Sequence, residues 1–256
     1  MDYKLGKQAP RRDPRTLKFA EYLGADVPAP LTCDWSQHVG KPWGMMANDN
    51  VGDCTCAAAG HMIETWTANC GSGVVPADAD VLSAYEAVSG YNPSDPGTDQ
   101  GAVELDVLSF WRKTGIGGHS IVAYTSVRPS VQQHVRAACY LFGGLYIGLQ
   151  LPLSANGQVG GLWDVPSQGL NGDGQPGSWG GHAVSIVAVD DDGLTCVTWG
   201  ALQRMTWAFW SAYTDEAYGV LSQDWVNLSV SWTTETLSPS WFDLNALQAD
   251  LAIVGS

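Results

Sequence analysis

The chain has 256 residues, of which 45% are hydrophobic, so it can bury one large core or two lobes that share one. Its formal net charge is −14, but six of the twelve basic residues fall within the first 18 positions. The remainder carries 6 basic and 24 acidic side chains, a net charge of −18. A body this acidic repels nucleic acid and anionic membranes, which excludes both as partners of that body.

The sequence has no N-terminal segment of signal-peptide type and no long apolar run. We therefore expect cytoplasmic synthesis and no membrane span. The six cysteines, at 33, 54, 56, 70, 139 and 196, lack the spacing of a disulfide scaffold or a zinc site, so we expect mostly free thiols. Glycine-rich acidic stretches at 171–175 and 190–193 resemble calcium loops only faintly, and the sequence predicts no metal and no cofactor.

Residues 1–40 are expected to form a basic N-terminal arm followed by an extended segment. A solvated tail is one interpretation of residues 1–18, and an arm that lies on an acidic neighbour is the other. On the second interpretation residues 1–18 bind a protein partner. Self-association of the chain, or its assembly into a virion, is compatible with either interpretation of residues 1–18.

The predicted elements change in character along the chain. A short helix is expected at 17–23, and a longer one begins at Cys54 after the loop 48–53. Helices follow at 78–88, at 102–114 and from Pro129, at the first helical position, to about 142, with one strand at 121–127. Residues 41–143 are thus predicted to form a helical lobe.

The second half is predicted to be mainly sheet. Strands are expected at 145–149, 182–189, 194–199 and 218–221, a glycine-rich loop at 155–181, and helices at 205–213 and 242–254. Residues 144–256 are therefore predicted to form a β-sheet lobe with a C-terminal helix. Helices first and strands later indicate an α+β fold, with a helical lobe packed against an antiparallel sheet lobe.

Two residues far apart in the sequence suggest nucleophilic catalysis. Cys54 lies where a polar loop becomes a helix, and the helix dipole and unpaired amides there favour a thiolate. His182 opens an apolar strand, so folding can bring the two together as a nucleophile–base pair. Cys56 falls on the apolar stripe of the helix and is predicted to be a packing residue, although the spacing leaves it open as the nucleophile. His61 is two helical turns from Cys54, too far to act as its base.

The segments Gly52-Asp53-Cys54-Thr55-Cys56-Ala57-Ala58, Gly181-His182-Ala183-Val184 and Val197-Thr198-Trp199-Gly200 resemble the nucleophile helix, the histidine strand and the following strand of papain-like cysteine peptidases. The resemblance covers roughly residues 45–215 and is greatest to the bacterial and phage branches, including bacteriocin-processing peptidases. The opening of the chain also resembles phage proteins that carry the Gly-Asp-Cys segment. The resemblance implies a papain-like fold, with Cys54 as nucleophile and His182 as base.

The same resemblance assigns the neighbours of this pair. Asn48, six residues before Cys54, would donate to the oxyanion, and Asn50 would do so if Cys56 were the nucleophile. The family's asparagine that orients the histidine aligns with Val197, which cannot hold an imidazole. Thr198 is adjacent and is a candidate supporting residue of the site, although its side chain is predicted to point to the opposite face of the strand from Val197. Trp199 would shield the pair, and Asp190 or Asp164 could orient the histidine from a loop.

Two functions follow from these features. The first is a papain-like cysteine hydrolase, a peptidase or amidase acting on a peptide or amide substrate, that could be carried in a phage particle. The second is a weak or inactive papain-like domain that serves as a structural or binding component of a virion. The missing asparagine at Val197 and the basic arm favour the second function.

Overall fold

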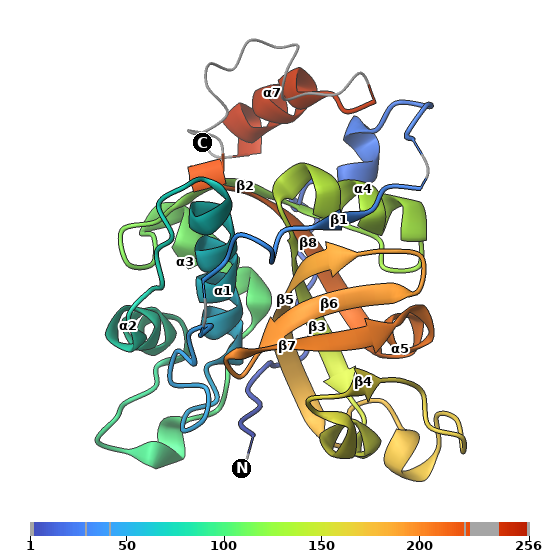
Figure 1. The fold of residues 1–256 in the computed structure, drawn as a ribbon. Coiled ribbons are helices and arrows are strands. Elements are labelled where there is room, and N and C mark those ends of the chain that lie inside the picture. Colours follow the sequence, from blue (N-terminus) through green and yellow to red (C-terminus); the bar gives the residue numbers. More distant parts are fainter. Residues whose placement is uncertain (1–2, 29, 41, 223, 226–240, 255–256) are drawn as a thin grey trace.

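A computed structural model describes residues 3–28, 30–40, 42–222, 224–225 and 241–254. Its helical part comprises the short 3-10 helices η1 (Phe19–Tyr22) and η2 (Pro96–Thr98), and the helices α1 (Cys54–Asn69), α2 (Asp78–Ser89) and α3 (Glu104–Lys113). Two further helices, α4 (Gln132–Phe142) and α5 (Trp207–Tyr213), flank the sheet, and α7 (Leu244–Val254) closes the described chain. In Figure 1, α1, α2 and α3 lie on one side and most strands on the other.

The described strands form one sheet. They are β1 (Cys33–Asp34), β2 (Ile121–Ser126), β3 (Leu145–Leu151), β4 (Leu162–Trp163), β5 (Gly180–Val189), β6 (Gly193–Thr198), β7 (Ala201–Thr206) and β8 (Thr214–Ser222). Their order is β2-β8-β3-β5-β6-β7-β4, and β1 pairs with the far end of β5. Every pair is antiparallel except β4 with β7, so the predicted α+β architecture is confirmed.

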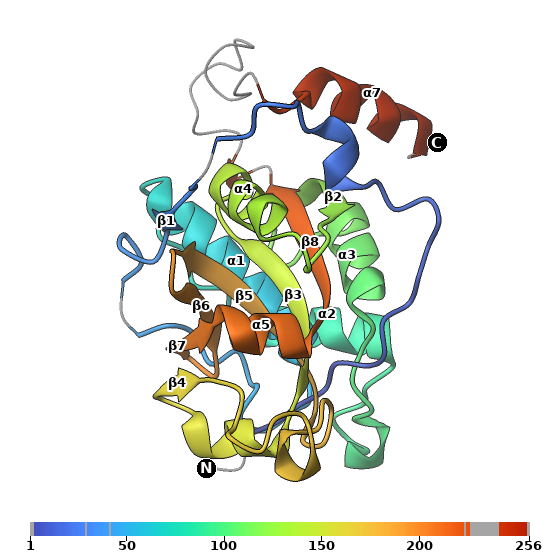
Figure 2. The same cartoon turned by 90° about the vertical axis from the view of Figure 1, so that its right-hand side faces the viewer.

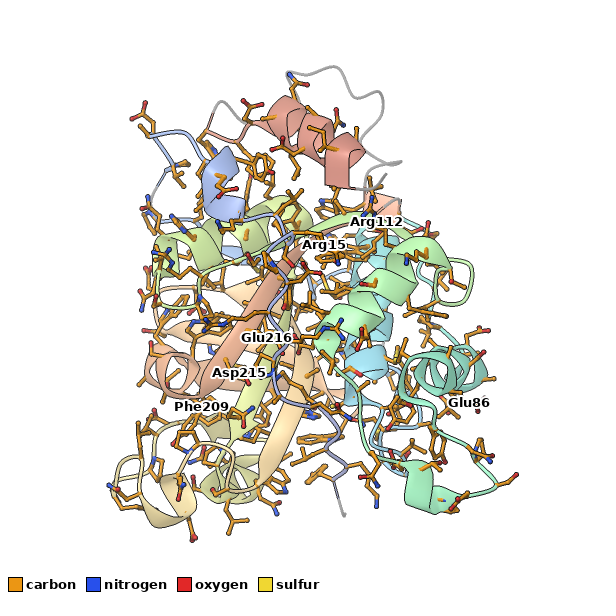
Figure 3. All side chains as sticks on the ribbon, turned by 180° about the vertical axis from the view of Figure 1, so that it is seen from behind. Arg15, Glu86, Arg112, Phe209, Asp215 and Glu216 are labelled. Carbon is orange, nitrogen blue, oxygen red and sulfur yellow. The ribbon has the colours of Figure 1, made fainter. Side chains whose placement is uncertain are left out.

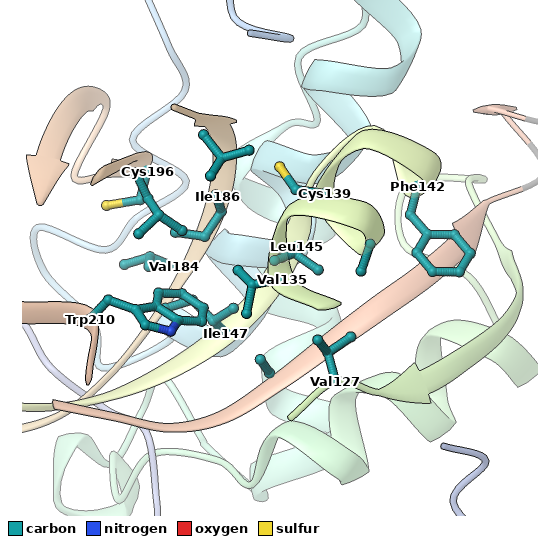
Figure 4. Packing of buried hydrophobic residues seen from close by; sticks show 14 of the residues in the cluster. Val127, Val135, Cys139, Phe142, Leu145, Ile147, Val184, Ile186, Cys196 and Trp210 are labelled. Carbon is teal, nitrogen blue, oxygen red and sulfur yellow. The ribbon is translucent and has the colours of Figure 1, made fainter. Parts of the chain in front are cut away.

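The sheet is covered by helices on both faces, as the side view in Figure 2 shows. One face packs against α4 and α5, where Val184 and Ile186 of β5 meet Val135 and Phe142 of α4 (Figure 4). The other face packs against α1, α2 and α3, where Ala183 of β5 is buried. Because neighbouring residues of a strand point to opposite faces, β5 contributes to both cores and reads as a continuous apolar run.

Several predicted elements differ from the structure in their bounds or number. The fourth helix begins at Gln132 after Val131, so Pro129 is not at its first helical position. Strand β7 was not predicted, and its last two residues were placed in the helix expected at 205–213, which begins at Trp207. Strand β1 falls in the expected extended segment and β4 in the expected loop at 155–181. Short two-residue strands carry too little alternation to be recognised in a sequence. The division at residue 143 stays a prediction, although β2, which precedes residue 143, pairs with β8, which follows it.

No described helix has the length and apolar character needed to cross a membrane.

The position of α1 depends on Trp66, near the end of that helix. Its side chain is fully buried, stacks on Trp111 of α3 with ring centroids 5.5 Å apart, and donates from Nε1 to the Phe142 carbonyl at 2.8 Å. Trp66 therefore ties α1 both to the helical layer and to the end of α4.

We predict that Trp66→Ala destabilises the protein by about 3–5 kcal/mol, because it leaves a large cavity beside Trp111. Trp66→Phe keeps most of the packing and loses the hydrogen bond, so it should cost about 1–3 kcal/mol. Urea unfolding followed by circular dichroism measures both. Equal losses for the two variants would show that the ring's packing does not set the position of α1.

Candidate active site

Cys54 is the first residue of α1 and lies against the start of β5. Its side chain is 1% exposed, and its Sγ accepts a hydrogen bond from the Ala183 amide at 3.4 Å. The structure therefore brings the predicted nucleophile next to the residue that follows His182. Cys56 is completely buried and Asn50 is exposed, so these two do not share a site in the way the alternative assignment required.

His182 lies at the start of β5 with its ring fixed on two sides. Its Nε2 is 2.7 Å from Thr198 Oγ1, and the ring stacks on Trp199 with centroids 4.4 Å apart and planes 16° apart. Trp199 holds this position with a left-handed backbone (φ 47°), a conformation that costs a non-glycine residue energy and often marks functional sites. Nδ1 is buried and has no hydrogen-bond partner among the described residues, Cys54 Sγ included.

Thr198 occupies the place that the sequence analysis left without an orienting residue. It does point away from Val197, which packs with Trp43 and Val187. His182 lies on the Thr198 face of the sheet and not on the Val197 face. Cys196 and Leu194 of β6 lie in the same core as Val184 and Ile186 of β5. Because alternate residues of a strand share a face, Thr198 and His182 lie on that side of the sheet as well. A hydroxyl thus contacts Nε2 where the resemblance led us to expect an asparagine.

The loop carboxylates proposed as orienting groups lie elsewhere. Asp190 follows the far end of β5, where it pairs with Arg204 and accepts from the amides of Asp192 and Gly193. Asp164 accepts from the Thr206 hydroxyl at 2.8 Å. Both carboxylates hold turns of the sheet, and neither is the partner of His182 Nε2.

Asn48 is buried beside Cys54, but its amide is engaged within the loop. Nδ2 donates to the Val51 carbonyl and to Asp53 Oδ1, each at 3.1 Å, which uses both of its hydrogens. Asp53 precedes α1 as predicted but makes no side-chain cap to the helix. In this conformation Asn48 shapes the loop, and its role as oxyanion donor stays a prediction.

The N-terminal arm lies against both Cys54 and the histidine strand. The Lys7 amide donates to the Gly181 carbonyl at 3.1 Å, and Ala102, just before α3, bonds on either side of Lys7 through its amide and carbonyl. Trp199 Nε1 donates to the Lys4 carbonyl at 3.1 Å. We call residues 3–8 the cleft segment, because they join the helical side of the molecule to the histidine strand; Figure 1 shows the N-terminus between the two parts.

Gly6 is the point of closest approach in the cleft segment. A Cβ at this position would lie 1.7 Å from the Gly52 carbonyl oxygen, so only glycine fits there. The Gly6 amide also hydrogen-bonds to Cys54 and lowers the pKa of that thiol. The cleft segment thus covers the predicted nucleophile itself.

Burial keeps both members of the pair neutral. It raises the pKa of the Cys54 thiol to about 12, in spite of the hydrogen bonds from the Ala183 and Gly6 amides. Burial, together with a smaller effect of His61, lowers the pKa of His182 to about 3. In this closed arrangement burial therefore favours the neutral forms of both the thiol and the imidazole.

His61 is a buried packing residue in the middle of α1. Its Nε2 lies 2.7 Å from the Gly44 carbonyl oxygen, and its ring meets Trp43 edge-on. In the part of the chain that the structure describes, no group of three or more His, Cys, Asp or Glu side chains is arranged to hold a metal ion.

Comparison with solved structures finds the same architecture in cysteine proteases. Xylellain, a cysteine protease from Xylella fastidiosa, matches 86% of this chain and 96% of its own, with a TM-score of 0.66 and 15% identity. Procathepsin B S9 from Trypanosoma congolense matches 86% and 87%, with a TM-score of 0.54 and 9% identity. The Carica candamarcensis protease CMS1MS2, solved with E-64, matches 75% and 98%, with a TM-score of 0.52 and 14% identity.

This chain has the papain-like fold. At these identities the likeness establishes the fold alone, and it gives no support to a phage or bacteriocin-processing branch in particular. No protein-family model and no curated protein matches the sequence. What this papain-like chain does must therefore be argued from its own residues.

We predict that Gly6→Ala displaces the cleft segment and speeds alkylation of Cys54 by iodoacetamide at least about tenfold at pH 7, because an exposed thiol ionises more easily than a buried one. Labelling is mapped by peptide mass spectrometry. Gly157→Ala is the matched control, since its added Cβ meets nothing within 4 Å and the rate should not change. Equal rates for wild type and Gly6→Ala would show that the cleft segment does not protect Cys54.

Proposed function

We propose that the protein is a thiol-dependent hydrolase of peptide or amide bonds, held in a latent state by its own cleft segment. The observation that carries the proposal is the placement of Cys54 beside the His182 strand, with His182 Nε2 held by Thr198 and Nδ1 unoccupied. This arrangement supplies a nucleophile, a base and a group that fixes the ring of the base.

The proposed reaction follows from these roles. His182 Nδ1 takes the proton from Cys54 Sγ, and the thiolate adds to the substrate carbonyl carbon. The Cys54 amide, which opens α1 and has no intrahelical acceptor, stabilises the resulting oxyanion. The imidazolium returns its proton to the leaving nitrogen as the C–N bond breaks and a thioester remains. Water, deprotonated by His182, then hydrolyses the thioester and frees Cys54.

Thr198 acts as a positioning residue in this scheme. Its hydroxyl can accept from Nε2–H, which fixes the tautomer that leaves Nδ1 as a base for the Cys54 proton. Release of the cleft segment lets water reach the pair, so burial no longer favours the two neutral forms. A protein partner that binds residues 1–18, as the charge of the arm suggests, would promote this release.

The second candidate is a structural or binding domain, such as a component of a phage particle. The closed cleft, the neutral pair and the engaged amide of Asn48 favour it, because each of them works against turnover. A hydrolase carried in a virion would combine the two. Cys54-dependent turnover by a chain whose cleft is open decides between the candidates.

We therefore expect Gly6→Ala to hydrolyse a fluorogenic peptide library and Gly6→Ala/Cys54→Ala to be inactive. Adding Thr198→Val to Gly6→Ala should lower kcat/KM about 10- to 100-fold, because it leaves Nε2 buried without a partner, whereas Thr198→Ser should retain most of the rate. A pH profile of kcat/KM for each variant reports whether Thr198 acts through the histidine. If folded Gly6→Ala shows no turnover that depends on Cys54, the hydrolase proposal fails and the binding domain stands.

A further inference from the structure

The cleft segment places one charged side chain in the interior of the protein. The Lys7 side chain is 0% exposed, and its Nζ lies 2.9 Å from Asp215 Oδ2 and 2.9 Å from Glu216 Oε1. A buried ammonium is costly unless it is paired, so these two carboxylates at the start of β8 offset the cost of its burial. Figure 3 shows Asp215 and Glu216 side by side where the arm crosses the back of the molecule.

A third acidic side chain is buried in this part of the interior and has an electrostatic interaction with Lys7. Glu104, the first residue of α3, is fully buried, and neither of its oxygens has a hydrogen-bond partner among the described residues. Burial, followed by the charge of Glu216, raises the pKa of Glu104 well above its ordinary value, while the ammonium of Lys7 acts in the opposite direction. Burial alone would lower the pKa of Lys7, but the three carboxylates outweigh it and raise the pKa, so the ammonium stays charged.

The surroundings are shaped to admit a long cationic side chain. A Cβ on Gly148 of β3 would lie 1.9 Å from Lys7 Cε, so the missing side chain of Gly148 makes room for the aliphatic stem. On the outer side, Asp215 and Glu216 border a cavity of about 420 Å³, which is also lined by Tyr218. The aliphatic stem of Lys7 thus reaches Asp215 and Glu216 from the cleft, and the same two carboxylates border the cavity on their outer side.

The position of this place relative to the candidate active site is fixed by the backbone. Lys7 hydrogen-bonds to Gly181, the residue before His182, and the preceding residue, Gly6, hydrogen-bonds to Cys54. A peptide that lay in the cleft in place of the cleft segment would thus present a side chain to Glu104, Asp215 and Glu216 within about one residue of the sulfur.

We propose that Glu104, Asp215 and Glu216 form a recognition pocket for the lysine or arginine side chain of an extended peptide, which the chain's own Lys7 fills in this structure. The peptide's role as substrate rests on the proposed hydrolase function, but its binding does not. The tethered cleft segment competes at an effective concentration in the millimolar range, so wild type should bind free peptides weakly. Removing the charge of Lys7 opens the pocket to them.

The test uses the full chain with Lys7→Met/Cys54→Ala, in which the lysine is replaced by a neutral residue of similar length and turnover is impossible. Pentapeptide amides that differ only in a central Lys, Arg, norleucine or Glu are titrated, and binding is followed by tryptophan fluorescence, because Trp199 and Trp179 line the cleft segment at Tyr3. We expect the Lys and Arg peptides to bind at least about tenfold more tightly than the norleucine peptide.

Adding Glu104→Gln and Glu216→Gln should remove this preference and leave the norleucine affinity unchanged. Equal affinities for Lys and norleucine, no binding of any peptide, or a preference that survives the two glutamine substitutions would each overturn the proposal. If Lys7→Met binds cationic peptides selectively but does not cleave them with Cys54 intact, the hydrolase proposal fails while the pocket stands.

A second measurement does not depend on peptides or on the stability of that variant. In Lys7→Ala, n-butylammonium can re-enter the pocket as a free cation, so it should raise the Tm in a saturable way, whereas n-butanol should not. A matching rise with n-butanol, or none with either compound, would contradict a pocket that selects cationic side chains.

Discussion

The contact between the first turn of α1 and the first residues of β5 is the constraint on which the site depends. The Ala183 amide meets the Cys54 sulfur, so helix and strand are in register at the point where chemistry is proposed. Two further contacts hold α1 in this position. The Tyr146 hydroxyl of β3 donates to the Thr55 carbonyl at 3.0 Å, and Trp66, near the other end of the helix, donates to the Phe142 carbonyl. Because β3 pairs directly with β5, the sheet fixes both the histidine and the start of the helix.

In the closed arrangement, the neutral side chains of Cys54 and His182 lie near the charged side chain of Lys7. Burial favours the uncharged forms of Cys54 and His182, since neither ion has water to solvate it. Lys7 brings in the one buried ammonium of the cleft segment and pairs with Asp215 and Glu216, which also accept hydrogen bonds from Gln150 and Tyr218. The cleft segment therefore excludes water from Cys54 and His182. Through Lys7 it also balances the charge of the carboxylates nearby.

The fold could be predicted from the sequence, and Cys54 and His182 could be selected as candidates, for a physical reason. A cysteine at a loop–helix junction and a histidine at the start of an apolar run are local patterns, and the segments around Cys54 and His182 have the residue types that the papain-like fold requires there. Thr198 was misjudged because strand alternation gives the relative faces of Val197 and Thr198 but not which face the imidazole occupies. That choice depends on the pairing of β5 with β6, which includes a shift in register between Ile186 and Ala188. The contacts of Gly6 and Lys7 could not be predicted, because the sequence of a basic arm does not indicate which carboxylates it will contact in the folded chain.

What holds the cleft segment in place is mostly chemistry that any peptide shares. Its backbone pairs with Gly181 and Ala102 through ordinary amide–carbonyl hydrogen bonds, and its apolar side chains are only partly buried against the core. Its specific features are the glycine at position 6, the ammonium of Lys7 and the parallel pairing of Lys7 with Ala102. Since a tether raises the local concentration of a segment without adding contacts, the arm can exclude other peptides with modest intrinsic affinity. On the proposal that cationic peptides enter this pocket, a competitor of the same charge would replace the arm once the tether no longer favours it, and closure of the cleft would be reversible.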